Sequence, residues 1–252
     1  MNTLEQTILQ LAVTGKLVAQ NSTELPASKS LELIAAKRKQ SSKSIKSASE
    51  ASAPFDLPTG WSWTKLPDIG ELSRGKSKHR PRNDPALFSN GTYPLIQTGD
   101  VARAKGWIKT YSSSYNKRGL EQSRLWPKGT MCITIAANIA DTALLGFEAC
   151  FPDSVVGFLP FENIFEVRYF DFFIKTAKTH LESFAPATAQ KNINLDILSN
   201  ICVPLPPAAE TRRIVAKVDE LIALCDALKA HLAQANTLHE QLADALVKQS
   251  CD

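Results

Sequence analysis

The chain has 252 residues and a formal net charge of +4, and 44% of its residues are hydrophobic against 21% that are charged. These values are typical of a globular protein with one or two domains. The first residues lack the basic and apolar regions of a signal peptide, and no apolar run approaches about 20 residues. We therefore expect a cytoplasmic protein that neither enters the secretory route nor inserts into a membrane.

Residues 1–53 are predicted to form a short helical region followed by a linker. Three apolar residues share one helical face: Leu4, Ile8 and Leu11. Gly15 follows at the position of a C-cap glycine, so residues 2–14 predict an amphipathic helix. A second helix is predicted over residues 30–39. Residues 40–52 contain mainly Ser, Lys and Ala without apolar periodicity, which is typical of a mobile linker.

Residues 54–206 are predicted to form a β-rich domain. A Pro and Gly turn leads into its first strand, and turn residues separate the short β-like runs that follow. Those runs cover residues 61–66, 93–98, 107–111, 131–136, 142–147 and 163–168. A helix is then predicted over residues 171–184, and a Pro-rich turn follows further along the chain.

Residues 207–252 are predicted to form a long helix with a narrow apolar seam. Steps of four and three residues alternate along this seam, as they do between the a and d positions of heptads. The seam comprises Ile214, Val218, Leu221, Cys225, Leu228, Leu232, Ala235, Leu242 and Leu246. A seam this narrow favours a partner helix, and a helix from Arg212 to Gln249 would span roughly 55–60 Å. His239 interrupts the seam, either as a polar residue that sets the register or at a frayed end of the coiled coil.

Positive charge is concentrated in one part of the sequence. Between Glu71 and Lys128, twelve Lys and Arg residues stand against four Asp and Glu, which gives a net charge of +8 there and −4 elsewhere. Aromatic, hydroxyl and amide side chains are interleaved with the basic ones, and such a mixture can neutralise phosphates and hydrogen-bond to base edges. We predict that this basic block binds nucleic acid. The alternative is that it is only a solvated surface.

The sequence lacks the patterns of a catalytic or metal site. Residues 70–77 (GELSRGKS) match the phosphate-loop pattern, but Pro81 and Pro85 prevent the helix that such a loop requires after its lysine. The four histidines show no metal-ligand spacing, and neither C-x-x-C nor G-x-S-x-G occurs. We therefore expect no catalysis and no metal or cofactor in this chain. Reduced thiols are expected at Cys132, Cys150, Cys202, Cys225 and Cys251.

Four segments together resemble the specificity (S) subunits of type I restriction–modification systems. TILQLAVTGKLV (7–18) resembles the family's IL-x-x-A-x-x-GKLV block, and LPTGWSWTKL (57–66) resembles the entry into a target-recognition domain. TAQKNINL (188–195) resembles the exit from that domain. VPLPPAAETRRIVAKVDEL (203–221) resembles the start of a spacer helix, with Thr211 where family members often have Gln. These segments follow the family's order and bracket nearly the whole chain.

The resemblance implies an α+β fold, in which a β-rich target-recognition domain is followed by a coiled-coil spacer helix. It implies a non-catalytic chain that reads one half of a bipartite site in double-stranded DNA. Modification subunits, which methylate adenine with S-adenosylmethionine, are expected to dock on the helices and the recognition domain. A restriction subunit that uses ATP and Mg is expected to join them, so these cofactors belong to partner subunits.

Full-length S subunits have two recognition domains and two spacer helices, whereas this chain has room for one of each. It is therefore expected to be a half-subunit, a truncated product or a fragment. We predict that it pairs with itself through antiparallel heptad helices and reads an inverted-repeat site, because two-fold symmetric dimers are the commonest homo-oligomers. Two other hypotheses are a stand-alone coiled-coil dimeric DNA-binding regulator and a structural adaptor with a solvated basic loop.

Basic, amide and hydroxyl side chains of the basic block and of the domain exit are the predicted DNA contacts. They are Arg74, Lys76, Lys78, Arg80, Arg82, Gln97, Thr98, Arg103, Lys105, Arg118, Gln122, Arg124, Gln190, Lys191 and Asn192. For the last three, an equally supported role is to brace the turn into residues 194–198.

Overall fold

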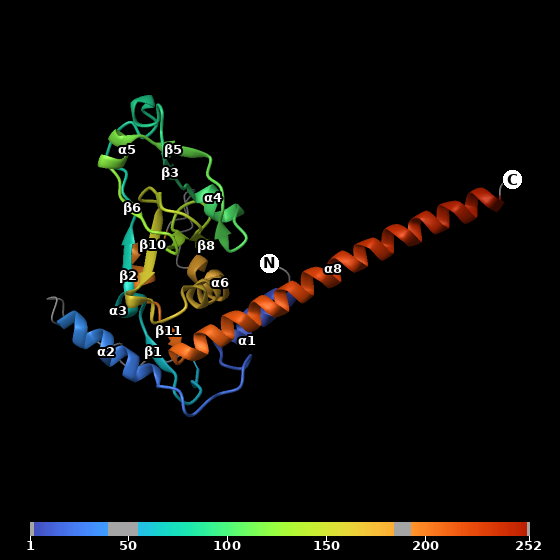
Figure 1. Ribbon diagram of the computed structural model, residues 1–252, viewed down its shortest axis with the longest axis horizontal. Coiled ribbons are helices and arrows are strands. Elements are labelled where there is room, and N and C mark those ends of the chain that lie inside the picture. The colour runs from blue at the N-terminus through green and yellow to red at the C-terminus, as the bar shows by residue number, and fades with distance from the viewer. Residues whose placement is uncertain (1–2, 40–54, 184–192, 251–252) are drawn as a thin grey trace.

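The computed structural model describes residues 3–39, 55–183 and 193–250. Figure 1 shows a β-rich body, with helices at its base and one long helix that projects away from it. This architecture confirms the α+β class. None of the helices in the described ranges combines the length and apolar character that crossing a bilayer requires.

Long helices lie at both ends of the chain and near the end of the β-rich body. They are α1 (Thr3–Val13), α2 (Ala27–Lys39), α6 (Val167–Ser183) and α8 (Ala208–Ser250). Short helices connect the strands, namely α3 (Leu66–Ile69), η2 (Pro85–Leu87), α4 (Thr98–Arg103), α5 (Lys117–Glu121), η3 (Phe161–Asn163) and α7 (Leu195–Asn200).

The strands form two mixed sheets and a ribbon. The five-stranded sheet has the order β2 (Gly70–Arg74), β10 (Val155–Pro160), β7 (Met131–Thr134), β8 (Thr142–Leu145) and β4 (Trp107–Ile108). The four-stranded sheet has the order β5 (Ser113–Tyr115), β3 (Tyr93–Leu95), β9 (Ala149–Cys150) and β6 (Leu125–Trp126). The β3–β9 and β4–β8 pairs are parallel, and the other pairs between described strands are antiparallel.

The ribbon joins the two ends of the β-rich body. In it, β1 (Ser62–Thr64) pairs antiparallel with β11 (Val203–Leu205), and Ser62 lies opposite Leu205. Because β11 leads directly into α8 and the pairing is antiparallel, it places the start of the long helix beside the residues that precede β1.

One large core cluster joins the five-stranded sheet to α1, α6 and α8. Tyr169 and Phe170 of α6 are fully buried in it, and the Phe170 ring meets the Phe158 ring of β10 edge-on at 5.2 Å. Burying a side chain such as Phe170 contributes about 1.5–3 kcal/mol. The cluster contains residues from all three predicted ranges, so the boundaries at 53/54 and 206/207 stay predictions.

A pair of stacked rings fills a second core cluster. Trp126 and Phe151 lie 5.0 Å apart, and both pack over Gly157 of β10. A Cβ at Gly157 would stand 2.7 Å from the Phe151 ring and 2.9 Å from the Trp126 ring. Glycine is therefore required at this point of β10 so that the four-stranded sheet can approach the five-stranded one.

The predicted helices are confirmed with changes at their ends. Gly15 has φ +71° and ends α1 as expected. Helix α2 begins at Ala27 rather than at residue 30, directly after a proline, where helices often start. The β-like run predicted over 163–168 is wrong. Asn163 ends η3, residues 164–166 belong to no regular element and α6 begins at Val167, because burying aromatic side chains there overrides strand propensity.

The four cysteines in the described ranges are free thiols, as predicted for a reduced protein. Burial raises the pKa of the Cys132 and Cys150 thiols, which makes them poor nucleophiles. Cys251 lies outside the described residues.

Helix α8 has 43 residues, equivalent to about 64 Å. The prediction that its whole seam needs a partner helix from another chain is wrong for the proximal half. Ile214, Val218 and Cys225 are buried within this chain, in the core shared with α1 and α6. Lys229 adds an ion pair with Glu5 of α1 at 2.7 Å.

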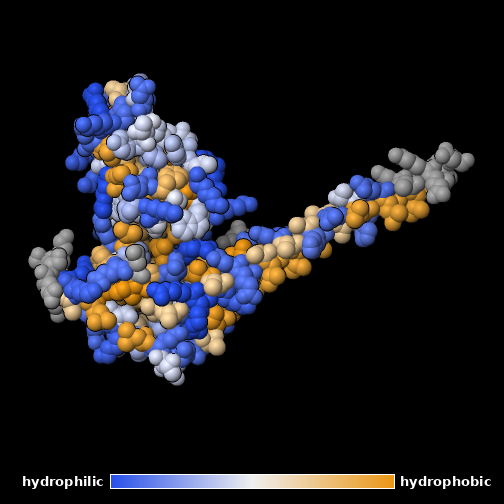
Figure 2. Space-filling model, viewed as in Figure 1, coloured by the Kyte–Doolittle hydropathy of each residue, from blue (hydrophilic) through white to orange (hydrophobic). Residues whose placement is uncertain are grey.

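From Leu224 onward, one side of α8 carries exposed leucines, which we call the leucine stripe. The stripe consists of Leu224, Leu228, Leu232, Leu238, Leu242 and Leu246, each 53–65% exposed. Figure 2 shows the apolar residues gathered along one side of the projecting helix. Exposed leucines in such a row mark a surface for association.

Glu210 fastens the start of α8 to the body. Its carboxylate is buried, and its two oxygens accept hydrogen bonds from Trp61 Nε1 at 3.0 Å and Gln20 Nε2 at 2.8 Å. A carboxylate in the first turn is also favoured by the helix dipole. Burial raises the pKa of Glu210 above its ordinary value, against the opposing effect of these hydrogen bonds.

We expect Glu210→Ala to lower the free energy of unfolding by about 1–3 kcal/mol, because it leaves the buried Trp61 donor without an acceptor. Glu210→Gln keeps an acceptor and should lose less. Since the pKa of Glu210 is higher in the folded state, its contribution to stability falls as pH rises above the ordinary value of 4.5. Urea unfolding across this pH window should show that decline in the wild type and not in Glu210→Gln. An identical pH dependence of the free energy of unfolding in the two proteins would show that Glu210 does not cause the decline.

Candidate nucleic-acid interface

The basic block, continuous in the sequence, is divided into two groups in the structure. The loop group surrounds the segment after β2 and contains Arg74, Lys76, Lys78, Arg80, Arg82, Arg118 and Gln122. The α4 group contains Gln97, Thr98, Arg103 and Lys105. Figure 1 shows α5 and α4 on opposite flanks of the end of the body that lies farthest from α2.

Hydrogen bonds hold the loop group against the segment after α5. The His79 amide donates to Gln122 Oε1 at 3.1 Å, and Ser123 Oγ donates to the Lys76 carbonyl at 2.9 Å. These contacts explain how residues more than forty positions apart form one basic surface. Lys76, Lys78 and Arg118 are exposed on it.

Asp153 anchors the other side of the loop group. Its carbonyl accepts from Arg74 Nε at 2.7 Å, and its carboxylate pairs with Arg82 at 2.8 Å. Arg80 donates to the carbonyls of Ser77 and His79. The three arginines therefore have fixed positions but remain exposed, which suits contacts to a polyanion.

The phosphate-loop interpretation of residues 70–77 is excluded by the backbone. Residues 70–74 form strand β2, and no helix begins at Lys76. A Cβ at Gly75 would lie 2.2 Å from the Phe151 carbonyl oxygen, so close approach to a neighbouring chain segment requires this glycine.

Arg124 has a different environment from the other predicted contacts. Both of its terminal nitrogens bond to the Glu71 carboxylate, one at 2.8 Å, and its guanidinium lies 3.8 Å above the Trp126 ring. The hydrogen bond from Arg124 lowers the pKa of Glu71. We therefore assign Arg124 a bracing role between β2 and β6 and leave it out of the proposed interface.

The α4 group surrounds a buried carboxylate. Gln97 occupies the N-cap of α4, and its backbone amide donates to Asp100 Oδ2 at 2.9 Å. Thr98 is half-buried, whereas Arg103 and Lys105 are exposed. Lys109, which we did not predict as a DNA contact, joins this group. Ile108, the last residue of β4, is buried and Lys109 directly after it is exposed, and this change was the available signal.

Gln190, Lys191 and Asn192 lie outside the described residues, so neither of their two predicted roles is tested. The turn that follows them is described. Ile193 donates its amide to the Ile135 carbonyl at 3.0 Å, and Asn194 Oδ1 caps α7 by accepting from the Ile197 amide at 2.9 Å.

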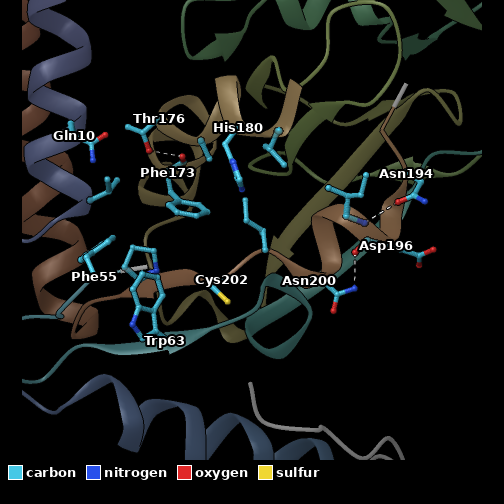
Figure 3. A pocket seen from close by; sticks show the side chains of 16 residues that line it. Gln10, Phe55, Trp63, Phe173, Thr176, His180, Asn194, Asp196, Asn200 and Cys202 are labelled. Atoms are coloured by element: carbon cyan, nitrogen blue, oxygen red, sulfur yellow. Dashed lines mark hydrogen bonds between the residues drawn. The ribbon is translucent and has the colours of Figure 1, made fainter. Parts of the chain in front are cut away.

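A largely apolar cavity of about 610 Å³ lies between α1, α6, α7 and the ribbon. Figure 3 shows its lining. Two of its polar side chains serve local structure: Asn200 Nδ2 donates to the Asp196 carbonyl at 2.9 Å, and Thr176 Oγ1 donates to the Phe173 carbonyl at 2.8 Å. In the described ranges, no group of three His, Cys, Asp or Glu residues is arranged to bind a metal.

Comparison with known proteins agrees with the resemblance seen in the sequence. Residues 58–236 match the type I restriction modification DNA specificity domain family (Methylase_S). The specificity subunit of the type I restriction enzyme EcoAI from Escherichia coli is 28% identical over 97% of this chain, and that of EcoEI from Escherichia coli is 25% identical over 98%. The matches cover 43% and 44% of those two proteins, so this chain spans less than half of their length.

Two solved structures share the fold. The HsdS subunit from Thermoanaerobacter tengcongensis is 22% identical with a TM-score of 0.56, and the match covers 81% of this chain and 46% of that one. A chain from a structure on complex assembly and conformational transition of the type I R-M system is 20% identical with a TM-score of 0.57. That match covers 86% of this chain and 50% of the other.

Proposed function

Because this chain belongs to the family of type I restriction modification DNA specificity domains, we propose that it recognises one half of a bipartite site in double-stranded DNA for a type I restriction–modification complex. The observation that carries the proposal is the exposed basic surface of the β-rich body. Glu210, buried at the start of α8, accepts a hydrogen bond from Trp61 and so fixes the body to the long helix. Such an arrangement holds a DNA-reading surface at a set distance from whatever the helix binds.

The loop group supplies the contacts that this function needs. Its lysines and arginines neutralise backbone phosphates and so position the body on the duplex. The arginines of the loop group and Gln97 of the α4 group have the donor pattern for base edges in the major groove.

The leucine stripe is proposed to bind the same stripe of a second copy in antiparallel orientation. No Asp, Glu, Lys or Arg belongs to the stripe, so two stripes can meet without burying an unpaired charge. The two copies are then related by a two-fold axis, and their bodies read an inverted-repeat sequence.

Catalysis is assigned to partner subunits. Modification subunits with S-adenosylmethionine would methylate adenine, and a restriction subunit with ATP and Mg would cleave DNA, while this chain binds none of these cofactors. We place the complex in the cytoplasm.

The test is co-expression of the full chain with a type I modification subunit, followed by affinity capture and genome-wide mapping of methylated adenine. We expect a stable complex and methylation at one inverted-repeat sequence, present only when both chains are expressed. Tight, sequence-specific DNA binding by this chain with no capture of the modification subunit would instead support a stand-alone dimeric regulator. Capture with no DNA binding would support an adaptor.

A further inference from the structure

We propose that the cavity between α4 and β4 binds one backbone phosphate of DNA and that Lys109 belongs to the interface. This inference rests on the proposed function and adds a second anchoring point to it, on the flank opposite the loop group.

The cavity has a volume of about 260 Å³ and a cationic wall. Arg103, Lys105 and Lys109 line it together with the carboxylate of Asp100, so the wall carries a net charge of +2. Trp107 and Thr110 complete the lining. The volume is roughly nine times the share of one water molecule in the liquid, which accommodates a phosphate group with part of its hydration shell.

Arg103 is held in place before any ligand arrives. Its Nη2 pairs with Asp100 Oδ1 at 2.7 Å, and the Asp100 side chain is 6% exposed whereas that of Arg103 is 70% exposed. Asp100 is itself fixed, because it accepts from the Gln97 amide at 2.9 Å and from Ser112 Oγ at 3.3 Å. A fixed carboxylate therefore orients an exposed guanidinium that still has unused donors.

Gly99 supports the same orientation. A Cβ at this position would stand 3.0 Å from Arg103 Nη1, so the guanidinium lies close over the glycine backbone. Ordering a long side chain costs free energy on binding, and an arginine that is already ordered avoids most of that cost.

The shape of the cavity favours a phosphate over a base edge. Arg103 ends α4, Lys105 lies in the following turn and Lys109 follows β4, so the three cations reach the cavity from different segments. A tetrahedral anion accepts donors from several directions, whereas a planar base edge requires a side chain that protrudes into a groove. Because the three like charges also repel one another, an anion among them is stabilised.

The test measures DNA binding by the full chain with its modification subunit at several salt concentrations, on two duplexes of unrelated sequence. Arg103→Ala and Lys109→Ala are each expected to weaken binding roughly tenfold on both duplexes and to lower the salt slope by about 1. Lys29→Ala is the matched control, because Lys29 is an exposed lysine of α2 at the other end of the body.

Asp100→Asn tests whether Asp100 affects DNA binding by positioning Arg103 or only through its negative charge. Removing a negative charge would tighten DNA binding if only net charge mattered, whereas loss of the Arg103 support should weaken it. We expect weaker binding, with the thermal unfolding temperature of Lys109→Ala unchanged.

Unchanged salt slopes in both alanine variants would overturn the phosphate cavity while leaving the proposed function intact. A loss confined to one duplex would also overturn it, since that result indicates base reading. Failure of the wild type to bind either duplex would overturn the proposed function itself.

Discussion

Replacing Leu228 and Leu232 by Glu should convert the proposed two-fold dimer into a monomer. These leucines are 61% and 65% exposed in the single chain, so their apolar area is available for burial between two copies. Burying a leucine contributes about 1.5–3 kcal/mol, and two copies contribute four such side chains. Even partial loss of that burial should raise the dissociation constant of the dimer by at least about 1,000-fold.

Sedimentation velocity at tens of micromolar measures the outcome. The matched control is Ala233→Glu with Thr237→Glu, which adds the same charge at the same spacing on the opposite side of α8, where both residues are exposed. The control should remain dimeric. Folding of the body should be unchanged in both variants, because the buried part of the helix ends at Cys225. A wild type that is monomeric, or a leucine variant that still dimerises, would remove the second copy as the partner of the stripe.

Replacing Lys76, Lys78 and Arg80 by Ala should weaken DNA binding roughly a hundredfold and reduce the salt slope by about 3. All three residues are exposed in the loop group. Their contacts to phosphate would release counterions, and each contact contributes nearly one unit to the slope. The same loss is expected on DNA of any sequence, because phosphate contacts position the protein without reading bases.

The control for this experiment is a variant with the same change in net charge elsewhere. Lys16, Lys29 and Lys217 lie outside the basic block, and replacing them by Ala should leave the salt slope within error of the wild type. Equal losses in the two variants would show that net charge alone governs binding. No loss in the loop variant would move the interface away from residues 74–82.

Local patterns in the sequence determined the helices and the general role of the basic block. The heptad spacing along α8 and the face shared by Ile8 and its neighbours in α1 follow from the period of 3.6 residues, which is a local property. The two prolines after Lys76 ruled out a phosphate loop, because a proline restricts its own backbone and that of the residue before it. The concentration of positive charge likewise needs no tertiary information.

Pairing between distant segments was decided only by the tertiary structure. Strand β10, between β2 and β7 in the sheet, was not among the predicted runs, since a short apolar stretch does not specify its partners. The ribbon between β1 and β11 joins residues more than 130 positions apart. The hydrogen bonds of Glu210 with Trp61 and of Arg124 with Glu71 also join distant positions, and no rule of sequence spacing relates them.

The apolar seam of α8 and the basic block show how sequence patterns and tertiary packing together determine the structure. The sequence determined that the residues from Ile214 to Leu246 form an apolar seam. Because both halves of the seam have the same helical period, the sequence did not distinguish the half that is buried within the chain from the half that is exposed. Only the packing of α1 and α6 decided that the half up to Cys225 is core and that the leucine stripe remains exposed. The basic block is continuous along the chain, yet it is divided between two flanks, because burial and strand pairing act on neighbours in space rather than in sequence.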